Sequence, residues 1–212
     1  MLLKEIYSEY DYNIEITGVQ TDSRFVKPGN LFLPIRGKNF EGDEFFIDAI
    51  TKGAVAIVYD KAIHNLTIPV IIVDNLEKEL FRLIDLIYEK PYNELTMIGV
   101  TGTDGKTSVS TLTSYLLNHL SRCANIGTNG IIYDKEIIDN VFTTPILTQN
   151  YSLLREFSNL GISYVSMEVS SQGIANKRIE GILYDYAIFT NLSHEHLDLS
   201  LIHISEPTRL AL

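Results

Sequence analysis

The chain has 212 residues, 45% of them hydrophobic, which is enough to bury a core in one or two domains and excludes a largely disordered protein. Its formal net charge of -10, with no local basic patch, excludes a general attraction to nucleic acid or anionic lipid. The apolar runs are too short to span a bilayer, and the N-terminus has acids where a signal peptide has basic residues. A single cysteine, Cys123, forms no internal disulfide and fits a reducing compartment. We therefore predict a cytoplasmic protein that binds neither nucleic acid nor membrane.

In the first part of the chain, short apolar runs alternate with helix-like segments, as in layered α/β domains. The predicted strands cover residues 31–35, 54–60 and 70–74. The predicted helices cover residues 44–53 and 76–90. The second helix runs into Pro91 and polar neighbours, which indicates a domain boundary near residues 89 to 95.

A second unit follows, with a strand at residues 95–100, a glycine loop, and a helix at 106–120 whose apolar positions recur every three or four residues. Further buried strands are predicted at 164–170 and 184–192, each ending in polar residues. Ligands gather at the carboxyl ends of parallel strands. The predicted fold class is α/β: a small N-terminal α/β domain, then a P-loop-type, mostly parallel central sheet flanked by helices.

The glycine loop reads GTDGKT at residues 102–107. Its glycines allow close backbone approach to a ligand, its amides point at anionic oxygens, and the helix N-terminus adds positive potential. Lys106 would then meet terminal phosphates, and Thr107 would offer its hydroxyl to Mg²⁺. The strict Walker-A spacing requires a glycine where Val100 stands, so a structural turn is the alternative. We favour phosphate binding because the loop joins a strand to a helix.

Acidic and histidine side chains follow two of the predicted strands. Glu168 ends a strand of apolar and small residues, where a carboxylate needs either a metal cation or hydrogen-bond donors. Beside a phosphate loop the metal is favoured, since Mg²⁺ on a nucleotide commonly takes a carboxylate from a neighbouring strand. The next candidate metal ligands, for which a solvated loop is the favoured alternative, are Asn191, His194, Glu195, His196 and Asp198.

Two other stretches have two interpretations each. Asp22, Ser23 and Arg24 precede a Pro-Gly turn, where the arginine and hydroxyl either hold a phosphate or form a capped turn with a solvated arginine. Thr143 and Thr144 precede a proline and a helix-like segment. They are either a helix-capping turn or hydroxyls that face a ligand, and the sequence pattern does not separate the two.

Together these stretches resemble the Mur ligases of peptidoglycan synthesis, most closely those of the third step. The resemblance runs in order through residues 18 to 198 and rests on TDSRFVKPGNLFLPIRG, GDEFFIDAITKGAVAIV, GVTGTDGKTS, NIGT, TTP, MEVSSQGI and FTNLSHEHLD. It implies an ATP-dependent amide-forming ligase, in which ATP phosphorylates a carboxylate of a UDP-sugar peptide and an amino acid's amine attacks the acyl phosphate. The implied substrates are UDP-N-acetylmuramoyl-L-Ala-D-Glu and either lysine or diaminopimelate.

The resemblance also implies roles for individual residues, with ATP and Mg²⁺ as cofactors. The residues implied in ATP binding are Gly102, Thr103, Gly105, Lys106, Thr107 and Ser108. Those implied in catalysis are Lys106, Glu168 and His196, and the implied metal ligands are Thr107, Glu168 and His196. Those implied in binding the UDP-sugar peptide are Ser23, Arg24, Thr143, Thr144, Ser170 and Arg178. The implied domains are a UDP-binding domain at 1–92 and a partial central ATP-binding domain at 93–198.

The chain departs from the family pattern at a few places. Gln172 stands where histidine is usual, and Asp104 where asparagine is common. Residues 199–212, LSLIHISEPTRLAL, match nothing expected, and the family's carbamylated lysine and C-terminal domain have no counterpart. We therefore expect a truncated central sheet, little or no ligase activity from this chain alone, and a monomer when complete. The alternatives are a non-catalytic fragment that binds a UDP-sugar or nucleotide, and a fourth-step Mur ligase.

Overall fold

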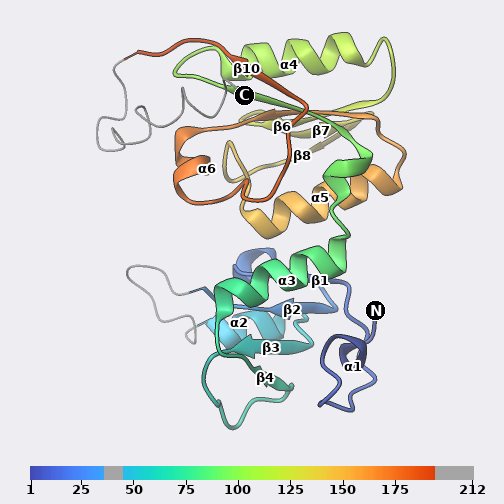
Figure 1. Cartoon of the computed structure of the whole chain (residues 1–212), viewed down its shortest axis with the longest axis vertical. Coiled ribbons are helices and arrows are strands. Elements are labelled where there is room, and N and C mark those ends of the chain that lie inside the picture. Colours follow the sequence, from blue (N-terminus) through green and yellow to red (C-terminus); the bar gives the residue numbers. More distant parts are fainter. Residues whose placement is uncertain (36–44, 194–212) are drawn as a thin grey trace. The chain divides into compact units, whose positions relative to one another are not determined.

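The computed structural model describes residues 1–35 and 45–193, which form two compact units (Figure 1), Met1–Glu89 and a second unit that begins at Lys90. Helix α3 (Leu76–Tyr88) ends the first unit. Glu89 and Lys90 both adopt left-handed backbone conformations, and Pro91 then opens the short 3-10 helix η3 (Pro91–Glu94). Left-handed residues followed by a proline cannot continue an α-helix, so α3 stops here.

The first unit is built on a four-stranded, all-parallel sheet in the order β1-β2-β3-β4. Its strands are β1 (Gly18–Gln20), β2 (Asn30–Phe32), β3 (Ala56–Tyr59) and β4 (Val70–Ile72). Its other elements are α1 (Leu3–Ile6), η1 (Ser23–Phe25), α2 (Phe46–Thr51) and α3. Side chains alternate along a strand, so Phe32 and Tyr59 share one face and pack with Phe46 of α2, whose ring lies edge-on to Tyr59 at 5.2 Å.

The second unit holds a six-stranded sheet in the order β10-β5-β9-β6-β7-β8, parallel except for the antiparallel pairs β6–β7 and β7–β8. Its strands are β5 (Thr96–Thr101), β6 (Cys123–Gly127), β7 (Gly130–Tyr133), β8 (Glu136–Ile138), β9 (Tyr164–Glu168) and β10 (Tyr186–Phe189). Its helices are α4 (Lys106–Leu117), α5 (Leu147–Asn159) and α6 (Ser171–Ala175). Helices α4 and α5 lie on opposite faces of the sheet (Figure 1).

Helix α4 packs on the sheet through small polar residues. Ser110 and Ser114 are buried, and the Ser166 hydroxyl of β9 donates to the Ser110 carbonyl at 3.0 Å. The large apolar residues of the helix point outward, with Leu112 59% and Tyr115 62% exposed. The serines let the backbone of α4 approach β9 closely, which brings the N-terminus of α4 near the strand ends.

The predicted fold class is confirmed: both units are α/β, with a parallel sheet in the first and a mostly parallel sheet flanked by helices in the second. Every predicted strand and helix is present, although most are shorter at their ends than the sequence pattern suggested. Four strands, β1, β6, β7 and β8, were not predicted. None of the helices within the two described ranges has the length and apolar character that crossing a membrane requires.

Candidate functional site

A cavity of about 520 Å³ lies in the second unit, at the carboxyl ends of its parallel strands. Residues that follow β5, β6, β9 and β10 line it, as expected for a ligand site in a parallel sheet. The structure brings most of the predicted site residues together here: Gly102, Thr103, Gly105, Lys106, Thr107, Thr143, Glu168, Ser170 and Arg178 all line the cavity. Ser108 lies in the exposed first turn of α4, and Thr144 is buried behind the cavity wall.

The glycine loop connects β5 to α4 with two residues in conformations that favour glycine. Gly102 has φ +134°, and Gly105 has φ +81° at the first position before α4. The Lys106 ammonium donates to the carbonyls of Gly102 and Thr103, each at 2.7 Å. These bonds fold the lysine over its own loop at the start of the helix, where the helix dipole already favours an anion.

Glu168 is the last residue of β9 and is 1% exposed. Its carboxylate accepts hydrogen bonds from the Thr107 hydroxyl at 2.9 Å, the Thr128 amide at 2.8 Å and the Thr128 hydroxyl at 3.3 Å. Gly127 gives it room, because a Cβ there would collide with the carboxylate. The buried charge is therefore satisfied by uncharged donors, and within the described residues no cation pairs with it.

The oxygen atoms of Glu168 and of the hydroxyls that bond to it suit a hard cation. The hydroxyls of Thr107 and Thr128 and the Glu168 carboxylate are all oxygen ligands, which Mg²⁺ prefers. Residues 1–35 and 45–193 contain no group of three or more His, Cys, Asp or Glu side chains able to hold a metal. Few protein ligands are typical of Mg²⁺, which keeps waters and phosphate oxygens. His196, the other predicted ligand, lies outside the described residues.

Thr144 and Ser170 are hydrogen-bonded to each other and to the end of β9. The Thr144 hydroxyl donates to the Glu168 carbonyl at 2.9 Å and accepts from the Ser170 amide at 3.0 Å. The Ser170 hydroxyl caps α6 by accepting from the Gly173 amide at 3.0 Å. Thr143 has a different environment: it lines the cavity. Neither threonine caps α5, whose N-cap is Ile146 without a side-chain hydrogen bond. Thr144 instead holds the connection between β9 and α6, and Thr143 lines the cavity.

Arg178 lines the same part of the cavity. Its guanidinium donates to the Thr144 carbonyl at 3.0 Å and lies 4.1 Å from the centroid of the Phe142 ring, a cation–π contact. Partial burial lowers the pKa of Arg178. Across the described ranges it makes no ion pair with a carboxylate, so its charge is available to an anion in the cavity.

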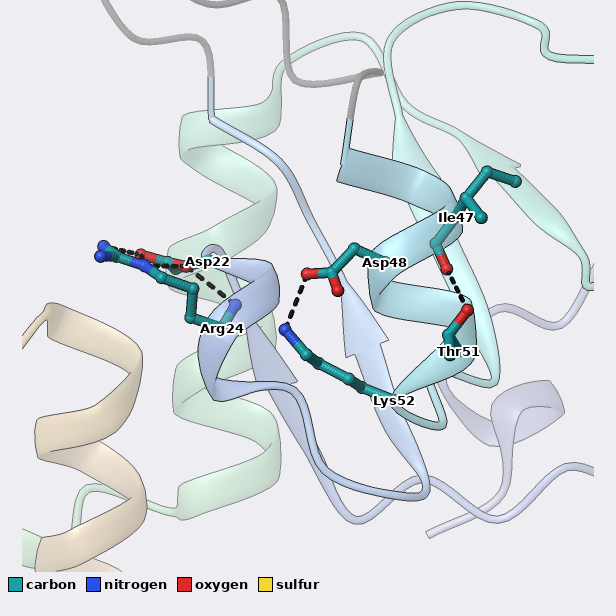
Figure 2. Close-up of polar contacts among 6 residues, drawn as sticks. All are labelled: Asp22, Arg24, Ile47, Asp48, Thr51 and Lys52. Carbon is teal, nitrogen blue, oxygen red and sulfur yellow. Dashed lines mark hydrogen bonds and ion pairs between the residues drawn. The ribbon is translucent and has the colours of Figure 1, made fainter.

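Ser23 and Arg24, predicted to contact the UDP-sugar, lie in the first unit. Figure 2 shows Arg24 beside its partner Asp22. The Arg24 guanidinium forms an ion pair with Asp22, with Nη2 2.6 Å from Oδ2. Burial alone would raise the pKa of Asp22, but the hydrogen bonds from Arg24 outweigh burial and lower that pKa. Asp48 pairs with Lys52 at 2.7 Å, and hydrogen bonds from Lys52 and Ser23 lower the pKa of Asp48. Ser23 is 4% exposed. The geometry around Asp22 is that of the capped turn.

Thr128 and Phe142 of the cavity, and Asn191 beside the glycine loop, have contacts that the sequence analysis did not assign to them. Thr128 holds Glu168; it ends the NIGT stretch that the sequence analysis noted without giving Thr128 a role. Phe142 stacks on Arg178. Asn191 was a candidate metal ligand, but its side-chain oxygen accepts from the Asp104 amide of the glycine loop at 2.9 Å.

The chain matches two family models: residues 15–84 match the catalytic domain of the Mur ligase family, and residues 100–203 match the Mur ligase middle domain. It is 37% identical over 201 residues to the UDP-N-acetylmuramoyl-L-alanyl-D-glutamate--2,6-diaminopimelate ligase of Haemophilus influenzae (strain PittGG), covering 90% of this chain and 41% of that protein. It is 41% identical over 189 residues to the UDP-N-acetylmuramyl-tripeptide synthetase 2 of Oceanobacillus iheyensis, covering 86% of this chain and 38% of that protein.

A solved structure of a UDP-N-acetylmuramoyl-L-alanyl-D-glutamate--2,6-diaminopimelate ligase superposes with a TM-score of 0.67 at 25% identity, covering 93% of this chain and 41% of that chain. The chain thus spans about two fifths of the length of the relatives it matches. The two family models cover most of both units, and the cavity residues fall within the second match. With sequence, family models and fold in agreement, the chain belongs to the Mur ligase family.

Proposed function

We propose that this chain carries the nucleotide and acceptor sites of an ATP-dependent ligase that adds the third amino acid to UDP-N-acetylmuramoyl-L-Ala-D-Glu. One observation carries the proposal: a single cavity is lined both by the glycine loop with Lys106 and by Thr143 and Arg178. Such a ligase must bring a phosphate donor and a carboxylate together, and this arrangement places an anion-binding group for each within one enclosure.

On the nucleotide side, the first amides of α4 have no partner within the helix and favour a bound anion. Lys106 has three donors, and two of them contact the carbonyls of Gly102 and Thr103. The remaining donor and the positive charge stabilise the transferring phosphoryl group, on which negative charge is spread over the oxygens. The loop and lysine therefore bind and orient the terminal phosphates of ATP.

Mg²⁺ fits the oxygen donors of Thr107 and Glu168, and when bound it would neutralise phosphate charge during transfer. The contribution of the chain is to hold these two oxygens ready. Thr128 fixes one carboxylate oxygen of Glu168 through its amide at 2.8 Å, which leaves the other directed at Thr107. His196 completes the proposed set of metal ligands.

On the acceptor side, Thr143, Ser170 and Arg178 are proposed to hold the UDP-muramoyl dipeptide. Thr144, which is fully buried, is proposed to act through the two of them that it bonds, Ser170 and Arg178. In the first step, a carboxylate oxygen of the dipeptide attacks the terminal phosphorus of ATP and ADP leaves. In the second step, the amine of lysine or diaminopimelate attacks the acyl carbon, loses a proton, and phosphate leaves. Arg178 is suited to the acceptor because its guanidinium has no carboxylate partner in the described part of the chain.

The first unit is proposed as the uridine-binding domain, spanning residues 1–92, with the ATP-binding domain at 93–198. Ser23 and Arg24 are the proposed contacts. Asp22 holds Arg24 in place, and about 60% of the Arg24 side chain stays exposed. The guanidinium can therefore donate to a phosphate from its open side while it keeps its carboxylate partner.

Calorimetric titration of the 212-residue chain with Mg-ATP, and separately with UDP-N-acetylmuramoyl-L-Ala-D-Glu, tests the proposal. Both ligands are expected to bind, and each is expected to raise the unfolding temperature. A matched titration with UDP-N-acetylmuramoyl tripeptide separates a third-step ligase from a fourth-step one, since the fourth-step enzyme takes the tripeptide as its acceptor. Failure of the wild-type chain to bind either nucleotide or dipeptide would sink the proposal.

A further inference from the structure

The segment Thr190–Ser193, which directly follows β10, is hydrogen-bonded to the glycine loop. Strand β10 pairs in parallel with β5, with Phe189 opposite Thr101. The two strands therefore end at the same edge of the sheet, and the segments that follow them begin side by side. The Thr190 amide extends this pairing by donating to the Thr101 carbonyl at 3.0 Å. Beyond this bond, side chains of Thr190 and Asn191 take over from backbone groups in bonding the two segments.

The Asn191 side chain bonds both backbone polar groups of Asp104, its N–H and its C=O. Its Oδ1 accepts from the Asp104 amide at 2.9 Å, and its Nδ2 donates to the Asp104 carbonyl at 3.2 Å. Thr190 adds a second donor to the same carbonyl, with its hydroxyl at 2.6 Å. One planar amide thus matches both the donor and the acceptor of a single loop residue, which fixes the orientation of its peptide planes.

Thr103 is held in the same way through its backbone and hydroxyl. Its amide donates to the Asn191 carbonyl at 3.0 Å, and its hydroxyl accepts from the Ser193 amide at 2.9 Å. A Cβ at Gly102 would collide with the Thr190 hydroxyl, so the approach of the two segments is as close as glycine permits. The Thr103 and Asp104 amides are therefore both committed to this segment.

We infer that Thr190 and Asn191 are positioning residues for the nucleotide-phosphate loop. Asn191 accepts from both loop amides, from Thr103 through its backbone carbonyl and from Asp104 through its side chain, while Thr190 holds the Asp104 carbonyl. The phosphate is therefore left to the amides from Gly105 onward and to Lys106. Because the Gly102 and Thr103 carbonyls also place the Lys106 ammonium, a loop released by Thr190 and Asn191 also loses its lysine position. This inference rests on the proposed nucleotide site.

The test compares Mg-ATP affinity in the 212-residue chain with Asn191→Ala, Thr190→Val and Thr190→Ser. Asn191→Ala is expected to weaken binding about tenfold, and Thr190→Val about fivefold, because each removes hydrogen bonds that order the loop. Thr190→Ser keeps the hydroxyl and is expected to restore affinity to within about twofold of wild type. Asn159→Ala, at the exposed end of α5, is the matched control and is expected to bind as wild type.

Two further readouts separate a loop effect from loss of the fold. Hydrogen exchange at the Asp104 amide is expected to be slow in wild type and to accelerate in Asn191→Ala, while the buried Cys123 stays unreactive to alkylation. Affinity of the UDP-dipeptide is expected to be unchanged. If the wild-type chain does not bind Mg-ATP, the proposed function fails. If wild type binds and Asn191→Ala binds equally well, or the wild-type Asp104 amide exchanges rapidly, the inference alone is overturned.

Discussion

The two units hold their charges in opposite ways. In the first unit, the cations near the predicted uridine contacts are paired with carboxylates: Arg24 with Asp22 at 2.6 Å and Lys52 with Asp48 at 2.7 Å. In the cavity of the second unit, Lys106 contacts backbone carbonyls, and the charge of Glu168 meets only hydroxyl and amide donors among the described residues. The charges of Lys106 and Glu168 are therefore offset by no opposite charge among the described residues, whereas those of Arg24 and Lys52 each have a carboxylate partner.

The sharpest form of this comparison changes one lysine in each unit. Lys106→Ala is expected to weaken Mg-ATP binding by about 10- to 100-fold, since a charge-assisted hydrogen bond is worth about 1.5–3 kcal/mol. Lys52→Ala removes an ammonium that pairs with a surface carboxylate, and is expected to leave nucleotide affinity unchanged. Titration calorimetry on both variants measures the contrast. Equal losses in the two variants would mean that general charge, not the loop, attracts the nucleotide.

Neutralising the carboxylate of the cavity is expected to separate function from stability. Glu168→Gln keeps an acceptor for the Thr128 amide but removes a buried charge that no described cation offsets. We expect the unfolding temperature to stay level or rise while Mg²⁺ no longer strengthens nucleotide binding. Thermal unfolding, together with ATP titrations with and without Mg²⁺, gives both quantities. A large fall in unfolding temperature would show that the charge is structural.

A side chain at position 127 would fill the space beside the Glu168 carboxylate. Gly127→Ala places a Cβ against the Glu168 carboxylate and is expected to destabilise the chain by about 1–3 kcal/mol through overpacking. In a Glu168→Ala background the added Cβ no longer meets a carboxylate, so Gly127→Ala should destabilise that variant much less. A double-mutant cycle by denaturant unfolding measures this coupling. Additive effects would contradict a direct contact between the two positions.

The smallest effect is expected from a paired charge of the first unit. Burial would raise the pKa of Glu79, but hydrogen bonds from Arg82 and Tyr7 outweigh it and lower that pKa. The stabilisation is therefore present above the unfolded pKa of about 4.3 and is lost as pH falls through the lower folded value. Half-exposed pairs are worth under about 1 kcal/mol. Unfolding midpoints at pH 7 and pH 3 should differ less in Glu79→Gln than in wild type.

The parts of the site that the sequence could predict depend on local spacing. The glycine loop was recognised because its glycines, lysine and hydroxyl follow one another between a strand and a helix. Glu168 stood out because a carboxylate in an apolar strand has to be satisfied. Both arguments need only a few consecutive residues, and the structure places both residues at one cavity.

The parts that could not be predicted depend on pairing between distant segments. Asn191 meets Asp104 across 87 positions, and only the parallel pairing of β10 with β5 brings them together. The hairpin β7–β8 turns at Asp134, whose φ of 51° suits a tight turn, but the sequence there lacks the glycine that usually marks one. Strand β6 carries a buried Asn125 in place of an apolar residue, so its pattern was not recognised.

The pairing of Asn191 with the backbone of residue 104 bears on how this sequence can vary. The bonds at residue 104 run to its amide and its carbonyl, which every residue except proline possesses. Its side chain is exposed and carries none of them. The shape of the loop at this position therefore depends on the side chains of Thr190 and Asn191 and not on the side chain of residue 104. An aspartate can accordingly occupy a position where asparagine is usual, and the loop keeps its shape through the substitution.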